Sequence, residues 1–190
     1  MQSVINTGIQ TSRTYKSYSR IFFSICLGFL ILLSNNCLAQ NNDKTKDKLI
    51  TTIFLVRHAE KENDGSRDPE LNKKGEERAD KLCEMLIKSE ITAIYSTNYK
   101  RTKNTAAPLA KKTDIEIQIY KPNDKSVIKD IIDKNKGSNI LIVGHSNTIP
   151  KLVNQLINKE KYVDLTDDEY NKLFVVSLTE NGSKCFVQQF

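Results

Sequence analysis

Two stretches of the chain are apolar without interruption, and each ends in a histidine. Residues 53–56 run Ile-Phe-Leu-Val into Arg57 and His58, and residues 139–144 run Asn-Ile-Leu-Ile-Val-Gly into His145. A short apolar run of this kind is typical of a strand that is buried on both faces, as in a parallel sheet. Open α/β sheets bind ligands beyond the carboxyl ends of such strands. The pattern therefore predicts two core strands that each deliver a histidine to that edge.

Elsewhere the apolar residues recur at the spacing of amphipathic helices, or alternate as in strands. The expected helices cover residues 75–89, 98–112, 124–137 and 148–157. Further strands are expected over residues 91–95, 115–120, 174–178 and 184–187. The last two flank Asn181-Gly182, a strong hairpin turn signal. Strands that alternate with helices predict an α/β fold, a three-layer α/β/α sandwich with a mostly parallel central sheet.

Two details of this pattern concern the ends of helices. We expect Gly137 to end the third helix, because glycine commonly follows a helix in a left-handed conformation. The acidic run Asp167, Asp168 and Glu169 is typical of the first turn of a further helix, where the dipole favours negative charge.

The first 39 residues have a different pattern from the rest of the chain. Three basic side chains precede the apolar residues 21–33, and Cys37 and Ala39 supply small residues at the two cleavage positions. A basic region, a short apolar region and such a site together are typical of a secretory signal peptide. The alternative is a retained membrane anchor formed by residues 21–33, although a span needs about 20 residues.

This reading divides the chain into three parts. We expect residues 1–39 to be the signal peptide, cleaved near Ala39, residues 40–48 to be a polar linker, and residues 49–190 to form one domain. The protein would then be exported, either to a periplasm or out of the cell.

Charge and cysteine content narrow the classes of partner. Residues 1–39 carry three basic and no acidic side chains, so the net charge of +6 falls to +3 after cleavage, without a basic cluster. We therefore expect neither nucleic acid nor, after cleavage, a membrane as a partner. Cys83 and Cys185 remain; burial as small hydrophobes is favoured, and a disulfide between them stays open. The absence of a Cys/His cluster argues against a zinc site.

The candidate chemistry lies at the predicted strand ends. Both histidines of the chain, His58 and His145, occur there, together with Arg57 and the polar residues 96–101. Arginine offers a planar fork that matches phosphate oxygens, and helix amino termini add further donors. A neutral imidazole inside such a pocket can attack phosphorus and form a covalent intermediate. The residues therefore predict a pocket for a dianionic tetrahedral group.

Three segments at these positions resemble the three motifs of the histidine phosphatase superfamily, which has the phosphoglycerate mutase-like fold. They are Arg57-His58-Ala59-Glu60, residues 96–106 and residues 143–148. The resemblance extends from about Ile50 to the end of the chain, with the motifs in family order and spacing. Each motif alone is weak evidence, but three in order are specific.

The resemblance implies a role for each matching residue. His58 would be the phosphorylated nucleophile, and His145 the second histidine that stabilises the phosphoryl group. Arg57 and Arg101 would bind the transferring phosphate. The remaining matches that would line the same pocket are Ser146 and Asn147.

The proton donor of the family has no clear counterpart in this chain. Asp124 follows the expected edge strand at roughly the place where the family's acid arises, and Glu60 is a second candidate, as an acid or as a residue that orients the nucleophile. A substrate with a good leaving group requires no acid.

The leading hypothesis is an exported phosphatase that hydrolyses a phosphomonoester or phosphoramidate of a small molecule, without metal or cofactor. The alternative is a phosphoryl-ligand binding module with little or no turnover. A phosphoglycerate-type mutase is less favoured, because the chain lacks room for the acidic motif and insertions of the mutases. Neither the substrate nor the oligomeric state follows from the sequence.

Overall fold

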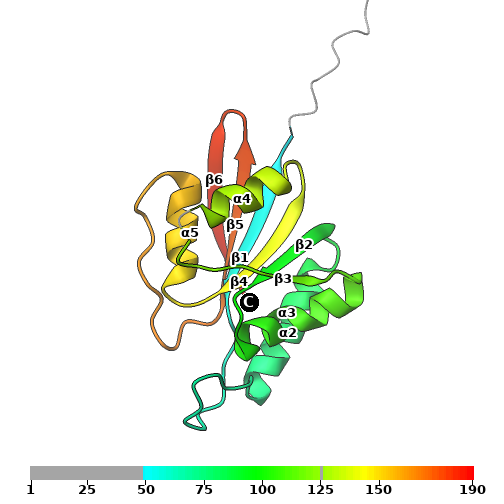
Figure 1. The fold of residues 1–190 in the computed structure, drawn as a ribbon, viewed down its shortest axis with the longest axis vertical. Helices are drawn as coiled ribbons and strands as arrows, with labels where there is room; N and C mark the ends of the chain where they lie inside the picture. The colour runs from blue at the N-terminus through cyan, green and yellow to red at the C-terminus, as the bar shows by residue number, and fades with distance from the viewer. Residues whose placement is uncertain (1–48, 125) are drawn as a thin grey trace, which may run out of the picture. The chain divides into compact units, whose positions relative to one another are not determined.

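A six-stranded sheet forms the centre of the domain in the computed structural model, which describes residues 49–124 and 126–190 (Figure 1). The expected signal peptide and the polar linker lie outside the described residues. In spatial order β3-β2-β4-β1-β5-β6, the strands are β3 (Ile117–Ile119), β2 (Ile91–Ser96), β4 (Asn139–Gly144), β1 (Thr51–Arg57), β5 (Lys172–Thr179) and β6 (Gly182–Gln189). The four strands from β3 to β1 are parallel, and the hairpin β5–β6 joins them antiparallel. The prediction of a mostly parallel sheet is confirmed.

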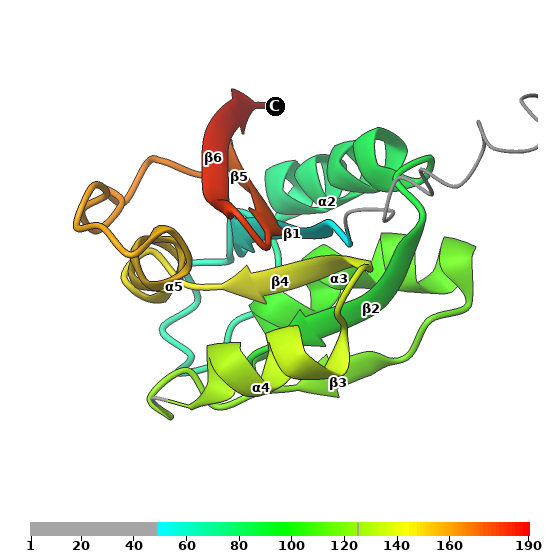
Figure 2. The same cartoon turned by 90° about the horizontal axis from the view of Figure 1, so that it is seen from above.

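Helices cover both faces of this sheet (Figure 2). One cluster of buried side chains joins the sheet to α2 (Lys73–Leu86) and α3 (Lys100–Thr113). The other joins it to α4 (Val127–Lys134) and α5 (Thr148–Ile157). The domain is therefore the three-layer α/β/α sandwich that the sequence predicts.

The uninterrupted apolar runs follow from this double cover. In β1, Ile53 and Leu55 pack in the cluster with α4 and α5, whereas Val56 packs in the cluster with α2 and α3. In β4, Ile140 and Ile142 alternate with Leu141 and Val143 in the same way, and all of these side chains are fully buried. Because successive side chains enter the two cores in turn, the central residues of both strands, 53–56 and 140–143, are all apolar, and the polar residues lie at the strand ends.

Helix α3 begins at Lys100, two residues after the expected start at residue 98. Tyr99 is the residue before the helix, and its side chain makes no capping hydrogen bond. The carboxylate of Asp68 supplies the cap instead, accepting the backbone N–H of Lys100 at 2.9 Å. Residues 97–99 are therefore not part of the helix. They continue from the end of β2, where Thr97 and Tyr99 lie beside His145.

Two predictions about helix ends are wrong. Helix α4 ends at Lys134 rather than at Gly137, which lies beyond it in a left-handed conformation with φ +77°. The acidic run from Asp167 to Glu169 forms a turn in the loop between α5 and β5 rather than a helix. That loop is stabilised locally, because Glu169 accepts the backbone N–H of Thr166 at 2.8 Å and pairs with Lys172.

The two cysteines of the described residues are free thiols. Cys83 is buried in the cluster with α2 and α3, whereas Cys185 packs against the cluster on the opposite face of the sheet. The sheet separates them, so they do not form a disulfide within this domain.

Candidate active site

The two histidines meet at the carboxyl ends of neighbouring strands. Arg57, the last residue of β1, pairs in register with Gly144, the last residue of β4. His58 and His145 follow directly, and the backbone N–H of His58 donates to the carbonyl of Gly144 at 2.9 Å. The ring centroids lie 5.5 Å apart at an interplanar angle of 69°. The sequence prediction that both histidines reach one edge of the sheet is therefore confirmed.

His58 is held as a neutral imidazole in one tautomer. Its Nδ1 lies 2.8 Å from the carbonyl oxygen of Ala59, and because a carbonyl only accepts, Nδ1 carries the proton. Burial lowers the pKa of His58 to about 3; the Ala59 carbonyl opposes this shift, and the positive charges of Arg57 and Arg101 add to it. The lone pair of Nε2 is therefore free near neutral pH, as a nucleophile requires.

His145 is also neutral and is positioned by a threonine. Its Nε2 lies 2.9 Å from Oγ1 of Thr97, a residue that follows β2 and is 1% exposed. Burial, followed by the charges of Arg101 and Arg57, lowers the pKa of His145 to about 4. Thr97, at the end of β2, therefore fixes the orientation of the His145 ring.

Arg57 is tied to the loop between α5 and β5. Its Nη1 donates to the carbonyl oxygens of Thr166 at 2.7 Å and Glu169 at 3.2 Å, and its guanidinium carbon lies 4.0 Å from the centre of the Tyr170 ring. The side chain is 5% exposed, and its buried Nε has no hydrogen-bond partner among the residues that the structure describes. One guanidinium donor is therefore left without a protein acceptor.

Arg101, in the first turn of α3, also lies against a tyrosine ring. Its guanidinium carbon lies 4.3 Å from the centre of the Tyr99 ring. Its Nη1 is 3.5 Å from Oδ1 of Asp68, which makes an ion pair, but within the described part of the chain this buried nitrogen has no hydrogen-bond partner. Two cations with unused buried donors thus flank two neutral imidazoles, and such a set of groups is suited to an anion.

Ser146 and Asn147 lie beside His145 at the start of α5. Ser146 is half-buried, and its carbonyl accepts the backbone N–H of Leu165 at 3.0 Å. Asn147 is exposed and precedes the helix without capping it through its side chain. Their place near the pocket fits the expected lining role, although their side chains make no hydrogen bond with either imidazole in the described structure.

Glu60 is engaged elsewhere. Its two carboxylate oxygens accept hydrogen bonds from Nε and Nη2 of Arg78, both at 2.7 Å, and Lys74 lies 3.3 Å away. Burial raises the pKa of Glu60, but the hydrogen bonds from Arg78 outweigh it, and the pKa lies below its ordinary value. A carboxylate held ionised by α2 is not suited to donate a proton or to orient His58 directly.

Asp124 is equally unsuited to the acid role. It is exposed, and its Oδ1 accepts the backbone N–H and the hydroxyl of Ser126, each at 2.9 Å. These hydrogen bonds keep the pKa of Asp124 below its ordinary value. The structure therefore assigns it to the turn before α4.

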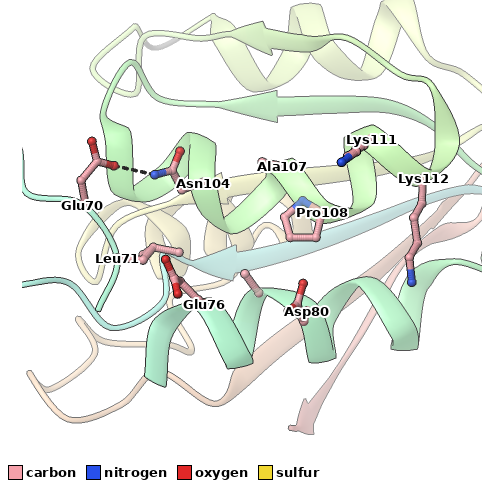
Figure 3. Close-up of a pocket in the computed structure, with 10 residues that line it drawn as sticks. Glu70, Leu71, Glu76, Asp80, Asn104, Ala107, Pro108, Lys111 and Lys112 are labelled. Atoms are coloured by element: carbon pink, nitrogen blue, oxygen red, sulfur yellow. Dashed lines mark hydrogen bonds between the residues drawn. The ribbon is translucent and has the colours of Figure 1, made fainter. Parts of the chain in front are cut away.

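A separate cleft of about 860 Å³ lies between α2 and α3 (Figure 3). Its walls carry Glu76 and Asp80 on one helix and Lys111 and Lys112 on the other, and neither histidine lines it.

Across residues 49–124 and 126–190, no His, Cys, Asp or Glu side chains gather as a metal-binding group, and no helix is long and apolar enough to span a bilayer.

Sequence reasoning missed three side chains of the site. Thr97 carried a signal, because it directly follows β2 within the second motif-like segment. Tyr99 lies in the same segment, but the helical spacing does not indicate that its ring contacts Arg101. Tyr170 lies in the loop between α5 and β5, 112 residues after His58 in the sequence. Its ring comes to 6.1 Å from the imidazole only because of the path that this loop takes in the fold.

The fold and the site together define a class of protein: an α/β sandwich with a histidine pair and two arginines at the carboxyl edge of its sheet. The family model of the histidine phosphatase superfamily (branch 1) matches residues 53–121, which include Arg57, His58 and Arg101. Over these residues the chain matches the histidine phosphatase superfamily, the family that the resemblance of its three motifs predicted.

The chain is also similar to individual proteins over different lengths. Phosphoserine phosphatase 1 of Hydrogenobacter thermophilus is 35% identical over 71 residues, which is 34% of each chain, so the match spans about a third of that relative. Among solved structures, YhfR of Bacillus stearothermophilus has a TM-score of 0.60 at 18% identity and covers 73% of this chain and 96% of its own.

Two further structures share the fold at similar distance. A mycobacterial glucosyl-3-phosphoglycerate phosphatase has a TM-score of 0.58 at 14% identity, covering 74% of this chain and 98% of its own. A phosphoserine phosphatase of Entamoeba histolytica, solved in complex with phosphoserine, has a TM-score of 0.55 at 15% identity, covering 71% and 94%. At such identities the likeness establishes the phosphoglycerate mutase-like fold and no more.

Proposed function

We propose that the protein is a phosphatase that hydrolyses a phosphomonoester or phosphoramidate of a small molecule through a phosphohistidine on His58. One observation carries the proposal. A neutral imidazole with a free Nε2 lies beside two arginines that each keep a buried donor without a protein acceptor. The phosphatase names of its relatives agree with this chemistry.

The reaction has two displacements at phosphorus. In the first, Nε2 of His58 bonds to phosphorus as the bond to the leaving group breaks, and the electron pair departs with the leaving atom. In the second, water attacks the phosphohistidine, the N–P bond breaks and its electron pair returns to Nε2, while the proton from water passes to the released phosphate. Arg57, Arg101 and His145 bind the phosphoryl oxygens and stabilise the charge that both steps require.

Protonation of the leaving group limits the substrates. Because Glu60 is bound to Arg78 and Asp124 to Ser126, the described structure offers neither as a proton donor. The leaving atom takes its proton from water in this proposal. Substrates with good leaving groups, such as aryl phosphates and phosphoramidates, are therefore expected to react faster than alkyl phosphates.

His58→Ala tests the nucleophile. The parent protein should hydrolyse p-nitrophenyl phosphate in the presence of a chelator, and the variant should lose at least about a thousandfold in kcat, since removal of a nucleophile leaves only binding effects. Acid quenching of the parent should trap a protein-bound phosphoryl group that is absent from His58→Ala. Full activity in the variant, or no trapped adduct during turnover, would contradict the proposal.

A phosphoryl-ligand binding module is the second candidate, and the lack of a placed proton donor favours it. Under this reading the parent protein binds phosphate or vanadate but releases no product from any phosphorylated metabolite in a screen. A mutase would instead exchange the phosphoryl group between positions of one substrate.

Export of the protein remains a proposal. The mass of the mature protein, which shows where its amino terminus begins, tests it.

A further inference from the structure

Each arginine of the candidate site is paired with a tyrosine, and each tyrosine also contacts one of the two histidines. The Tyr170 ring lies 4.0 Å from the guanidinium carbon of Arg57 and 6.1 Å from the ring of His58. The Tyr99 ring lies 4.3 Å from the guanidinium carbon of Arg101 and 5.1 Å from the ring of His145, at 90° to it. The two tyrosines come from different loops, Tyr99 directly before α3 and Tyr170 before β5.

We propose that Tyr99 and Tyr170 are positioning residues that hold the two guanidinium groups in the planes from which they bind the phosphoryl group. The inference rests on the proposed phosphoryl site, but it concerns two residues to which the motifs assign no role: Tyr170 lies outside all three segments, and Tyr99 lies within the second. The distances carry it, because a cation within about 6 Å of an aromatic face is attracted to the ring.

The need for such restraint follows from the other contacts of the arginines. Arg57 has one nitrogen, Nη1, bound to the carbonyls of the loop, so one edge of its guanidinium group is already fixed. The ring of Tyr170, 4.0 Å from the guanidinium carbon, then limits how far the rest of the group can turn. Arg101 has less support, since its other polar contact is the ion pair with Asp68 at 3.5 Å. Without Tyr99, its side chain would be free to turn away from His145.

The restraint also has an energetic consequence. A long arginine side chain loses rotamer freedom when it binds an anion, and a group that is ordered beforehand loses less. A guanidinium group stacked on a ring in a partly dry site gains the attraction of the ring without giving up its N–H donors to a protein acceptor. Both arginines therefore keep directed donors available for phosphoryl oxygens.

The test measures the affinity of the protein for inorganic phosphate in two ways: by direct binding, and from the inhibition constant of phosphate as a competitive inhibitor of aryl phosphate hydrolysis. Tyr99→Leu and Tyr170→Leu should each weaken phosphate binding by roughly 3- to 30-fold, the range expected from loss of one cation–π contact. Tyr99→Phe and Tyr170→Phe keep the ring and should stay within about threefold of the parent, because the contact depends on the ring rather than the hydroxyl.

Tyr162→Leu is the matched control. Tyr162 lies in the same loop as Tyr170, but its ring packs against Phe174, 5.1 Å away. This variant should bind phosphate as the parent does. Equal losses in Tyr162→Leu and Tyr170→Leu would overturn the inference, because they would show a general effect on the loop. Equal losses in the Leu and Phe variants would also overturn it, since the hydroxyl would then be the active group.

The experiment separates this inference from the proposed function. A parent protein that binds phosphate without hydrolysing any ester would refute the phosphatase proposal, while weaker binding in the Leu variants would still support the positioning role. An active parent with unchanged phosphate affinity in both Leu variants would refute only the positioning role. A parent that binds no phosphate would refute both.

Discussion

At the scale of single residues, the chemistry depends on which nitrogen of His58 carries its proton. Nδ1 of His58 keeps its proton and donates it in a hydrogen bond to the carbonyl of Ala59, and burial keeps the ring neutral, so that Nε2 carries no proton. His145 is kept neutral for the same physical reason and receives its orientation from Thr97. Both imidazoles are thus prepared for contact with an anion before one binds.

The titration of the two histidines tests this state. Because the chain has two histidines, their ring protons give two signals in an NMR titration, which His58→Gln assigns. Burial places the pKa of His58 at about 3 and that of His145 at about 4, so neither ring should gain a proton between about pH 8 and pH 5.5. A midpoint near the ordinary value of about 6.5 for either ring would contradict the described environment.

At the scale of elements, the segment after β1 is held against the start of α2. The backbone N–H of Asn72 donates to the carbonyl of Glu60 at 3.0 Å, and the side chain of Asn72 accepts the N–H of Gly75 at 2.9 Å. A Cβ at Gly75 would lie 2.0 Å from the carbonyl oxygen of Glu60. Only glycine permits this approach, which fixes the chain two residues beyond the nucleophile.

Gly75→Ala should therefore disturb both the fold and the site. We expect a loss of about 1–3 kcal/mol in the free energy of unfolding, the usual range for overpacking, although alanine favours the helix itself. Denaturant unfolding measures this loss, and phosphate binding should weaken with it. Glu76→Ala, at the next and exposed position of α2, is the control and should change stability by no more than about 0.5 kcal/mol. Equal stability of the two variants would show that α2 can shift freely.

At the scale of the whole molecule, two neutral histidines, one buried and one half-buried, make folding depend on pH. In the unfolded chain each imidazole binds a proton below about pH 6.5, whereas burial in the folded protein lowers the pKa to about 3 for His58 and about 4 for His145. The unfolded state therefore binds more protons between these values. This contribution to stability is fully present above the unfolded pKa and is lost as pH falls toward the folded pKa.

A double variant separates this contribution from that of the carboxylates. Between about pH 7 and pH 5, the parent should lose on the order of 2–4 kcal/mol more unfolding free energy than His58→Gln/His145→Gln. Carboxylates with lowered pKa, such as Glu60, change both proteins in the same direction and cancel in the comparison. Parallel pH dependence of the two proteins, measured by denaturant unfolding, would contradict the burial of neutral imidazoles.

Much of the architecture could be predicted because it depends on local patterns. The uninterrupted runs before His58 and His145 required strands buried on both faces, and the helical stripes such as Ala79, Leu82 and Leu86 required helices packed on a sheet. The hairpin followed from Asn181-Gly182, and the family followed from three short segments in order. Helix ends were less predictable, because Asp68 caps α3 from another part of the chain.

By itself, the sequence determined which residues end the core strands, and hence that two histidines and Arg57 share one edge of the sheet. The tertiary structure alone decided how those groups are held. Contacts between residues far apart in the sequence pair Glu60 with Arg78, Thr97 with His145 and Tyr170 with Arg57. The periodicity of hydrophobic residues does not predict these contacts. The physical reason is that strand ends follow from hydrophobic periodicity, whereas the partners of polar side chains depend on where distant loops meet.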